Sequence, residues 1–233
     1  MLSIYRPIES SRVTQVFGAN GVCTQMMDNG VFPIRPFRTT PKQGGVCPWG
    51  YKEFYPLTGM KGHNGVDRAA WVGEPIYHSA NFDGIAHLET DKDGGIGVDI
   101  VSVKNVLNCT EGTCKAMHRV KKRFWHCSKV LVTEGQLVKM GDLIALAGNT
   151  GASTGVHVHD ATKWCADDGG AVHRDNGYLG AFDDSAYYKD EFVRDVIQQK
   201  EKMLLPEGCP VQKGEVPLDW GQKFNKFLFW ITK

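Results

Sequence analysis

Short apolar segments alternate with turn sequences from about residue 13 to residue 162. Most of these segments are about three to seven residues long and rich in β-branched side chains, which favours strands over helices. Glycine-containing turns such as Asp91–Gly95 and Gly148–Gly151 separate them. The pattern predicts a mainly β fold with an antiparallel sheet, and its expected strands include Pro75–Tyr77, Gly84–Leu88, Gly97–Val103, Val130–Val132 and Asp142–Ala147.

Two segments depart from this pattern. Residues from about 20 to 62 carry five prolines among glycines and aromatics, so we expect a long ordered loop. Its aromatics would pack onto the body or, alternatively, line a groove. After Phe182, apolar residues recur at three- and four-residue spacing, which predicts a helix of about twenty residues capped by Asp184 or Ser185. A tail rich in aromatics follows, which we expect to dock on the body, with docking on a partner as the alternative; its apolar residues are Trp220, Phe224, Phe227, Leu228 and Trp230.

Composition narrows the function classes. The 233 residues carry 27 Lys and Arg against 26 Asp and Glu. The charges nearly balance, so the chain has no overall electrostatic field that would attract nucleic acid or an anionic membrane. No apolar run of about 18 residues is present to span a bilayer. The N-terminus lacks the succession of basic, apolar and small residues that is typical of a secretory signal. Seven cysteines are too few for a scaffold held together by disulfides, and we infer no redox compartment from them.

Histidines supply the candidate chemistry. In an extended strand, His157 and His159 would project from one face about 6.6 Å apart, with Val158 facing the core. His63 and Asp67 lie among glycines, and Gly65 between them removes a side chain that would block convergence on a metal. Two imidazoles and a carboxylate are a ligand set that catalytic zinc accepts, with one position left for water. The spacing alone leaves open which of the paired histidines is the ligand.

Several motifs together resemble one family. In chain order they are His63–Asp67, Pro75–Tyr77, Gly97–Val101, His126 followed by Ser128, Gly135–Ile144 and Gly148–His159. This series is similar to the lysostaphin-type (LytM-like) zinc metallopeptidases, and the similarity covers about residues 13 to 162. We therefore expect a LytM-like peptidase domain at residues 1–180 and a C-terminal helical appendage and tail at residues 181–233.

The resemblance implies a function and assigns roles. His63, Asp67 and His159 would hold one zinc ion per chain, and His126 and His157 would be the catalytic histidines. The implied activity is hydrolysis of peptide bonds in bacterial peptidoglycan, in stem peptides or cross-bridges, so the partner is a wall peptide and the place of action is the cell wall, periplasmic or extracellular. Because the sequence shows no secretion signal, a phage lysin or a virion-associated wall hydrolase is a further interpretation. The sequence predicts neither the bond that is cut nor the oligomeric state.

Three other functions are compatible with the same sequence features. The alternatives are a non-catalytic LytM-like module that activates another wall hydrolase, a structural component that keeps zinc for stability, and a zinc dipeptidase or carboxypeptidase.

The sequence also departs from the family pattern. The stretch from Asn105 to Arg123 is an insertion that, with the loop before His63, could wall the groove, and Asp160 stands where an aromatic or aliphatic residue is common. We interpret the basic run Arg119–Arg123 as a solvated charged strand, with binding of an anionic wall polymer as the alternative. Cys109, Cys114 and His118 are poorly spaced for structural zinc, so we favour a hairpin disulfide or free thiols.

Overall fold

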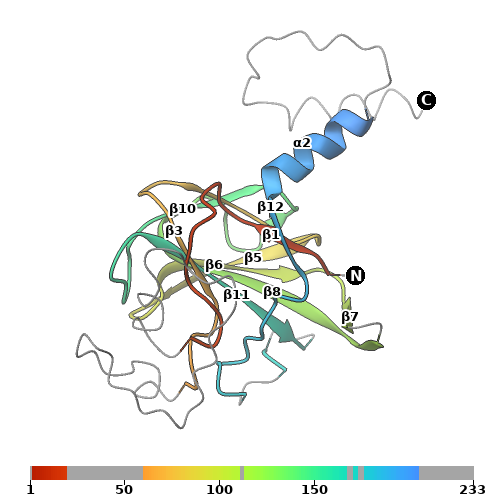
Figure 1. Cartoon of the computed structure of the whole chain (residues 1–233), viewed down its shortest axis with the longest axis horizontal. Coiled ribbons are helices and arrows are strands. Elements are labelled where there is room, and N and C mark those ends of the chain that lie inside the picture. The colour runs from red at the N-terminus through yellow and green to blue at the C-terminus, as the bar shows by residue number, and fades with distance from the viewer. Residues whose placement is uncertain (1, 20–59, 111–112, 167–169, 173–175, 205–233) are drawn as a thin grey trace. The chain divides into compact units, whose positions relative to one another are not determined.

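The computed structural model describes residues 2–19, 60–110, 113–166, 170–172 and 176–204, and its order of elements is shown in Figure 1. The fold is mainly β, as the sequence predicts. The elements are β1 (Ile4–Arg6), β2 (Val13–Gln15), β3 (Val66–Ala69), β4 (Pro75–Tyr77), β5 (Gly84–Asp91), β6 (Gly95–Ser102), β7 (Val106–Thr110), β8 (Thr113–Val130), β9 (Leu137–Val138), β10 (Leu143–Ala147), β11 (His157–Cys165), β12 (Tyr188–Phe192) and the helix α2 (Val193–Leu204).

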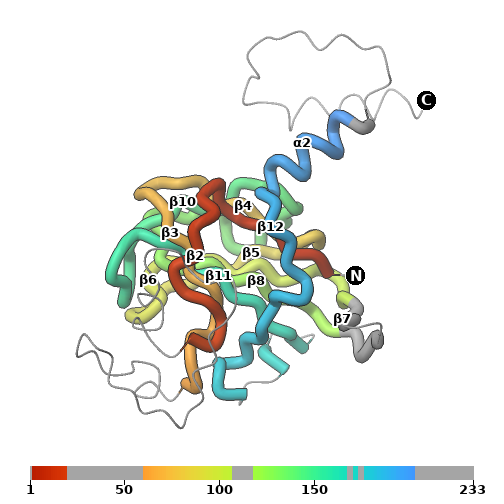
Figure 2. The backbone as a smooth tube through the Cα atoms, in the orientation of Figure 1, coloured from red at the N-terminus to blue at the C-terminus, as the bar shows by residue number. Residues whose placement is uncertain are grey.

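One antiparallel sheet positions the site. Its strand order is β2-β3-β11-β8-β6-β5-β9; off this path, β10 pairs with β8 and β4 pairs with β10. The β5–β6 hairpin turns where Asp91 Oδ1 accepts hydrogen bonds from the amides of Asp93 and Gly94. Gly95 follows with φ 70°, a conformation that glycine adopts without steric cost. Figure 2 shows the same backbone as a tube, with β3, β11, β8 and β6 labelled.

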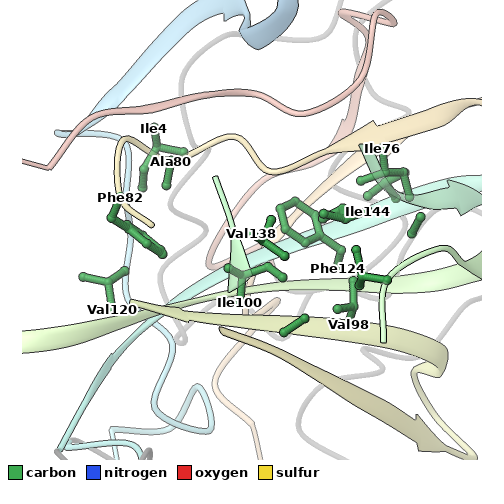
Figure 3. Close-up of a cluster of buried hydrophobic side chains, with 14 of the residues drawn as sticks. Ile4, Ile76, Ala80, Phe82, Val98, Ile100, Val120, Phe124, Val138 and Ile144 are labelled. Carbon is green, nitrogen blue, oxygen red and sulfur yellow. The ribbon is translucent and has the colours of Figure 1, made fainter. Parts of the chain in front are cut away.

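The hydrophobic core lies against one face of this sheet. Alternate residues of its strands, such as Val98 and Ile100 of β6 and Phe124 of β8, are fully buried there. Residues from outside the central strands, including Ile4, Ile76 and Ile144, close the core (Figure 3). The histidines of β11 project from the opposite face, because Val158 between them is buried in the core. The core therefore forms the support behind the histidine-bearing face.

The C-terminal helix is shorter than predicted. Residues 188–192 form β12, which pairs in parallel with β1, and α2 begins only at Val193. The four-residue spacing of Tyr188 and Phe192 fits a helix, yet the chain gains backbone hydrogen bonds from β1 instead. Asp184 does not cap a helix. Its carboxylate accepts a hydrogen bond from the Thr162 hydroxyl at 2.5 Å.

The strand β8 corrects two expectations. It runs for 18 residues and includes Val130, so Val130–Val132 is no separate strand, and its first half forms a hairpin with β7 in the predicted insertion. The basic run is a strand, but it is not solvated throughout, because Lys122 is fully buried. The Lys122 ammonium forms an ion pair with Asp160 and contacts Asp184 at 3.4 Å. This ion pair accounts for the unusual aspartate after His159.

Some expectations fall outside the described residues. They are the loop before residue 60, with its aromatics Trp49, Tyr51, Phe54 and Tyr55, and the aromatic tail. The chain divides into two compact units, Met1–Gln198 and Gln199–Lys233. The division at residues 180 and 181 stays a prediction. In the part of the chain that the structure describes, no helix combines the length and apolar character needed to cross a membrane.

Candidate metal centre

Three side chains converge on the face of the sheet opposite the core. Asp67 of β3 lies directly across from His159 of β11 in the antiparallel register, so both side chains project from the same face. Asp67 Oδ1 lies 2.9 Å from His159 Nδ1 and 3.1 Å from Nε2 of His63, and the two ring nitrogens are 3.0 Å apart. His63 comes from the segment just before β3, as the loop-or-strand alternative for this motif anticipates.

Gly65 makes this convergence sterically allowed. A Cβ at this position would lie 2.6 Å from His159 Cε1 and 2.7 Å from both His159 Nε2 and the carbonyl oxygen of Asp160. Any side chain would therefore push against the imidazole of His159. The prediction that Gly65 clears space for the cluster is confirmed by this geometry.

His157 lies beside the three converging side chains on the same strand face. Its Nε2 is 3.6 Å from Asp67 Oδ2. Its Nδ1 lies 2.7 Å from the carbonyl oxygen of Gly155 and 3.2 Å from the Ser153 hydroxyl. Because a carbonyl oxygen can only accept, Nδ1 carries the proton and donates it to Gly155. The other nitrogen, Nε2, is then an acceptor turned toward Asp67.

His126 reaches the same place through a β-bulge. The register between β6 and β8 shifts between Ile96 and Val98, where three steps along β8 oppose two along β6. His126 lies within this bulge with φ 64°, an uncommon conformation for a residue other than glycine. Its ring centroid lies 4.5 Å from that of His157 and 6.2 Å from that of His159. The bulge therefore brings a third strand's histidine to the cluster.

Thr150 is a residue of this site that the sequence reasoning did not single out. Its carbonyl oxygen lies 2.7 Å from Nδ1 of His126, which fixes the proton on that nitrogen. Its hydroxyl accepts from the Ile96 amide at 3.0 Å and donates to the Cys127 carbonyl at 2.8 Å. These bonds join β6, β8 and the Gly148–Gly151 turn. Only the conspicuous Gly-Asn-Thr-Gly run could have indicated it.

Burial and charge set the protonation of the cluster. Burial lowers the pKa of His159 to about 4, although the Asp67 carboxylate opposes this shift. Burial likewise lowers the pKa of His126, with the Thr150 carbonyl opposing it. Burial alone would raise the pKa of Asp67, but His63 and His159 hold it well below its usual value. Burial thus favours neutral imidazoles at His159 and His126, and the Asp67 carboxylate is ionised, which is the protonation state in which such groups bind metals.

The donor set and its spacing fit zinc. Among the described side chains, the ligand atoms of His63, Asp67 and His159 are the one group of three His, Cys, Asp or Glu residues arranged closely enough for a metal, all within 4.8 Å of one another. Zinc–ligand bonds of about 2.0–2.1 Å in a tetrahedron would separate ligand atoms by roughly 3.3 Å, close to the observed triangle. The outer nitrogen of His63 contacts the Val16 carbonyl at 3.2 Å, a supporting contact typical of metal-bound histidine.

The remaining histidines and cysteines lie apart from the cluster. His78 is buried and its Nε2 donates to the Phe82 carbonyl at 2.8 Å, whereas His87 forms a surface pair with Glu134. Cys109 and Cys114 face each other in the β7–β8 register, but their side chains lie outside the described set, so disulfide or thiol stays a prediction. Cys127 and Cys165 are buried thiols.

Residues 61–167 match the model of Peptidase family M23. Peptidoglycan DD-endopeptidase ShyB of Vibrio cholerae is 37% identical over 109 residues, which are 46% of this chain and 22% of that protein. DD-carboxypeptidase/endopeptidase Mpg of Neisseria meningitidis is 31% identical over 134 residues, 58% of this chain and 27% of that protein. The chain thus spans only about a quarter of the length of these relatives.

Solved structures with detectable similarity include two peptidases. The catalytic domain of lysostaphin from Staphylococcus simulans has a TM-score of 0.39 and 22% identity, over 53% of this chain and 77% of that chain. A zinc containing peptidase from Vibrio cholerae has a TM-score of 0.45 and 25% identity, over 81% of this chain and 40% of that chain.

Proposed function

We propose that this chain, whose residues 61–167 match the model of Peptidase family M23, is a zinc-dependent endopeptidase that hydrolyses peptide bonds in bacterial peptidoglycan. One observation carries the proposal: three ligand atoms from separate segments approach to within 3.1 Å of one another, with two further imidazoles beside them. The names of the two relatives above, a DD-endopeptidase and a carboxypeptidase/endopeptidase, support a wall peptide as the substrate. The place of action would be the cell wall.

The proposed metal ligands are His63 Nε2, the Asp67 carboxylate and His159 Nδ1. Zinc bound by such a set supplies Lewis acidity, which makes a water nucleophilic near neutral pH and polarises a carbonyl. The chain's own contribution is to present these atoms already converged, because Gly65 leaves room for the His159 imidazole and the β3–β11 register sets Asp67 directly across from His159. One ion per chain is expected.

His126 and His157 are the proposed catalytic histidines. Each donates a hydrogen bond from its Nδ1–H to a backbone carbonyl, His126 to that of Thr150 and His157 to that of Gly155, so Nε2 is the nitrogen that can accept a proton. His157 Nε2 lies 3.6 Å from the Asp67 carboxylate, beside the proposed metal ligands, where it can take a proton from a water and hold it. Once charged, either ring stabilises the negative charge that develops on a substrate carbonyl oxygen.

The experiment that tests the proposal uses intact peptidoglycans of several cross-link types. Zinc-loaded protein is incubated with each, and the new amino and carboxyl termini are identified by mass spectrometry. We expect new termini from one bond type, abolished in His157→Ala and retained in His87→Ala, a surface histidine control. Zinc-loaded protein that releases no new termini from any chemotype would contradict the proposal and favour the non-catalytic module. A phage or virion origin stays a prediction.

A further inference from the structure

Three cations share the sheet face that carries the metal centre. Antiparallel partners and alternate residues project from one face, so the His159–Trp125 pair is followed by Ala161–Arg123 and then by Lys163–Lys121. We call Lys121, Arg123 and Lys163 the cationic cluster. At about 3.3 Å per strand residue, Lys163 lies roughly 13 Å along β11 from His159.

One buried carboxylate serves this cluster. Asp99 of β6 accepts two hydrogen bonds from Arg123, at 2.7 Å from Nε and 2.6 Å from Nη2, so the guanidinium binds both of its oxygens. Lys121 shares the same carboxylate at 3.2 Å. Glu89 lies 3.7 Å from Arg123, on β5. Among the described residues, the cationic cluster thus forms ion pairs with two carboxylates, Asp99 and Glu89, and Lys163 is paired with neither.

Lys163 is the most confined of the three cations. It is 8% exposed, and its ammonium donates to the Leu179 carbonyl at 2.8 Å rather than to a carboxylate. Burial, then Arg123 and Lys121 against Asp99, lower its pKa to about 8. A buried ammonium next to two other cations raises the free energy of the fold, and an apolar residue of similar length would avoid this.

The backbone around Leu179 fixes this ammonium in place. Leu179 has φ 52°, a strained conformation for a leucine, and Gly180 follows at φ 84°. The Asn176 side chain holds the turn by accepting hydrogen bonds from the amides of Tyr178 at 2.8 Å and Gly180 at 3.1 Å. This turn therefore holds in place an ammonium that has no carboxylate partner among the described residues.

We propose that Lys121 and Lys163 bind a free carboxylate of the substrate peptide and so select substrates that carry one. The inference rests on the proposed function. An extended peptide bound across the metal centre and along this face would bring a carboxylate to the two ammonium groups three or four residues from the scissile bond, at about 3.3 Å per residue. Ion pairing at partly buried lysines favours a carboxylate over its neutral amide.

The test compares two matched cross-linked peptides, one with a free carboxylate beyond the scissile bond and one with the carboxamide. We expect zinc-loaded wild type to cleave the carboxylate peptide with about tenfold higher kcat/KM, mainly through KM. The double variant Lys121→Met, Lys163→Met should lose this preference while it keeps its activity on the carboxamide and its zinc content. Lys129→Met, which changes an exposed lysine of the same strand, should behave as wild type.

The outcomes separate the two proposals. Cleavage of both peptides by wild type with equal kcat/KM would overturn the carboxylate assignment and leave the proposed function intact, whereas no cleavage of either would overturn the function. Equal loss on both peptides in the double variant would mean a structural role for the lysines. A loss seen only on intact walls that carry phosphate polymers would also contradict a peptide carboxylate.

Discussion

Replacement of Gly65 by alanine should damage the metal centre without touching a ligand. The new Cβ would lie 2.6 Å from His159 Cε1, so the contact must open by about 0.8 Å to reach the ordinary distance of 3.4 Å. The opposing Asp160 carbonyl belongs to the β11 backbone, so the imidazole of His159 is the group that moves. Metal–ligand distances tolerate only about 0.2 Å, and we therefore expect zinc affinity to fall on the order of 100-fold, or about 2.7 kcal/mol.

The assay is a competition titration of zinc against a chromophoric chelator, with thermal unfolding of the metal-free protein as a check on folding. The matched control is Gly155→Ala, because a Cβ there meets nothing within 4 Å and the site is two residues from His157. We expect Gly155→Ala to bind zinc as wild type does. Unchanged zinc affinity in a folded Gly65→Ala protein would refute the reasoning that His159 is a ligand confined by Gly65.

Further variants test the other contributions. Asp67→Ala should lose most bound zinc by metal analysis, and unchanged stoichiometry would remove Asp67 from the ligand set. His126→Asn, whose side chain suits a left-handed backbone, should keep zinc yet lose turnover by roughly 10²–10⁴, and full turnover would exclude acid–base work there. Thr150→Val should reduce kcat about tenfold at constant zinc content, with Thr150→Ser restoring it; equal effects of both would contradict hydroxyl clamping. Because burial lowers the pKa of His78 to about 4, the unfolded chain takes up a proton first as pH falls below about 6.5. The free energy of unfolding should then drop by up to about 3 kcal/mol between pH 6.5 and 4, and a His78→Gln protein with the same pH slope would disprove this.

Part of the candidate site could be predicted from the sequence. Strand alternation predicts that His157 and His159 share a face, and the glycine between His63 and Asp67 predicts their close approach; both hold in the structure. The pairing of Asp67 with His159 depends on contacts between segments about ninety residues apart, and only the family resemblance supplied it. Local spacing carries no information about such a register.

The position of His126 illustrates what a sequence pattern does not contain. A regular strand would place it on the face of Phe124, inside the core, and the bulge with φ 64° reverses that. The bulge is held by Thr150 from a turn more than twenty residues away. Sequence periodicity assumes uninterrupted pairing, so it misses an irregularity that tertiary hydrogen bonds impose.

Buried charge and strand pairing explain the other differences. Lys122 belongs to a basic run that reads as a solvated strand, but its partners Asp160 and Asp184 meet it only after the sheet and the segment before β12 have come together. The same holds for residues 188–192, whose apolar spacing suits a helix but whose backbone pairs with β1. In both cases a long-range partner decides between two locally acceptable outcomes.

The identity of the metal ligands is tested most directly by anomalous X-ray scattering at the zinc edge from crystals grown with zinc. The account predicts a single strong peak about 2.0–2.2 Å from His63 Nε2, an Asp67 carboxylate oxygen and His159 Nδ1, with His126 and His157 uncoordinated. No peak at these atoms, or a zinc ion coordinated by His126 or His157 in place of any of the three, would contradict it.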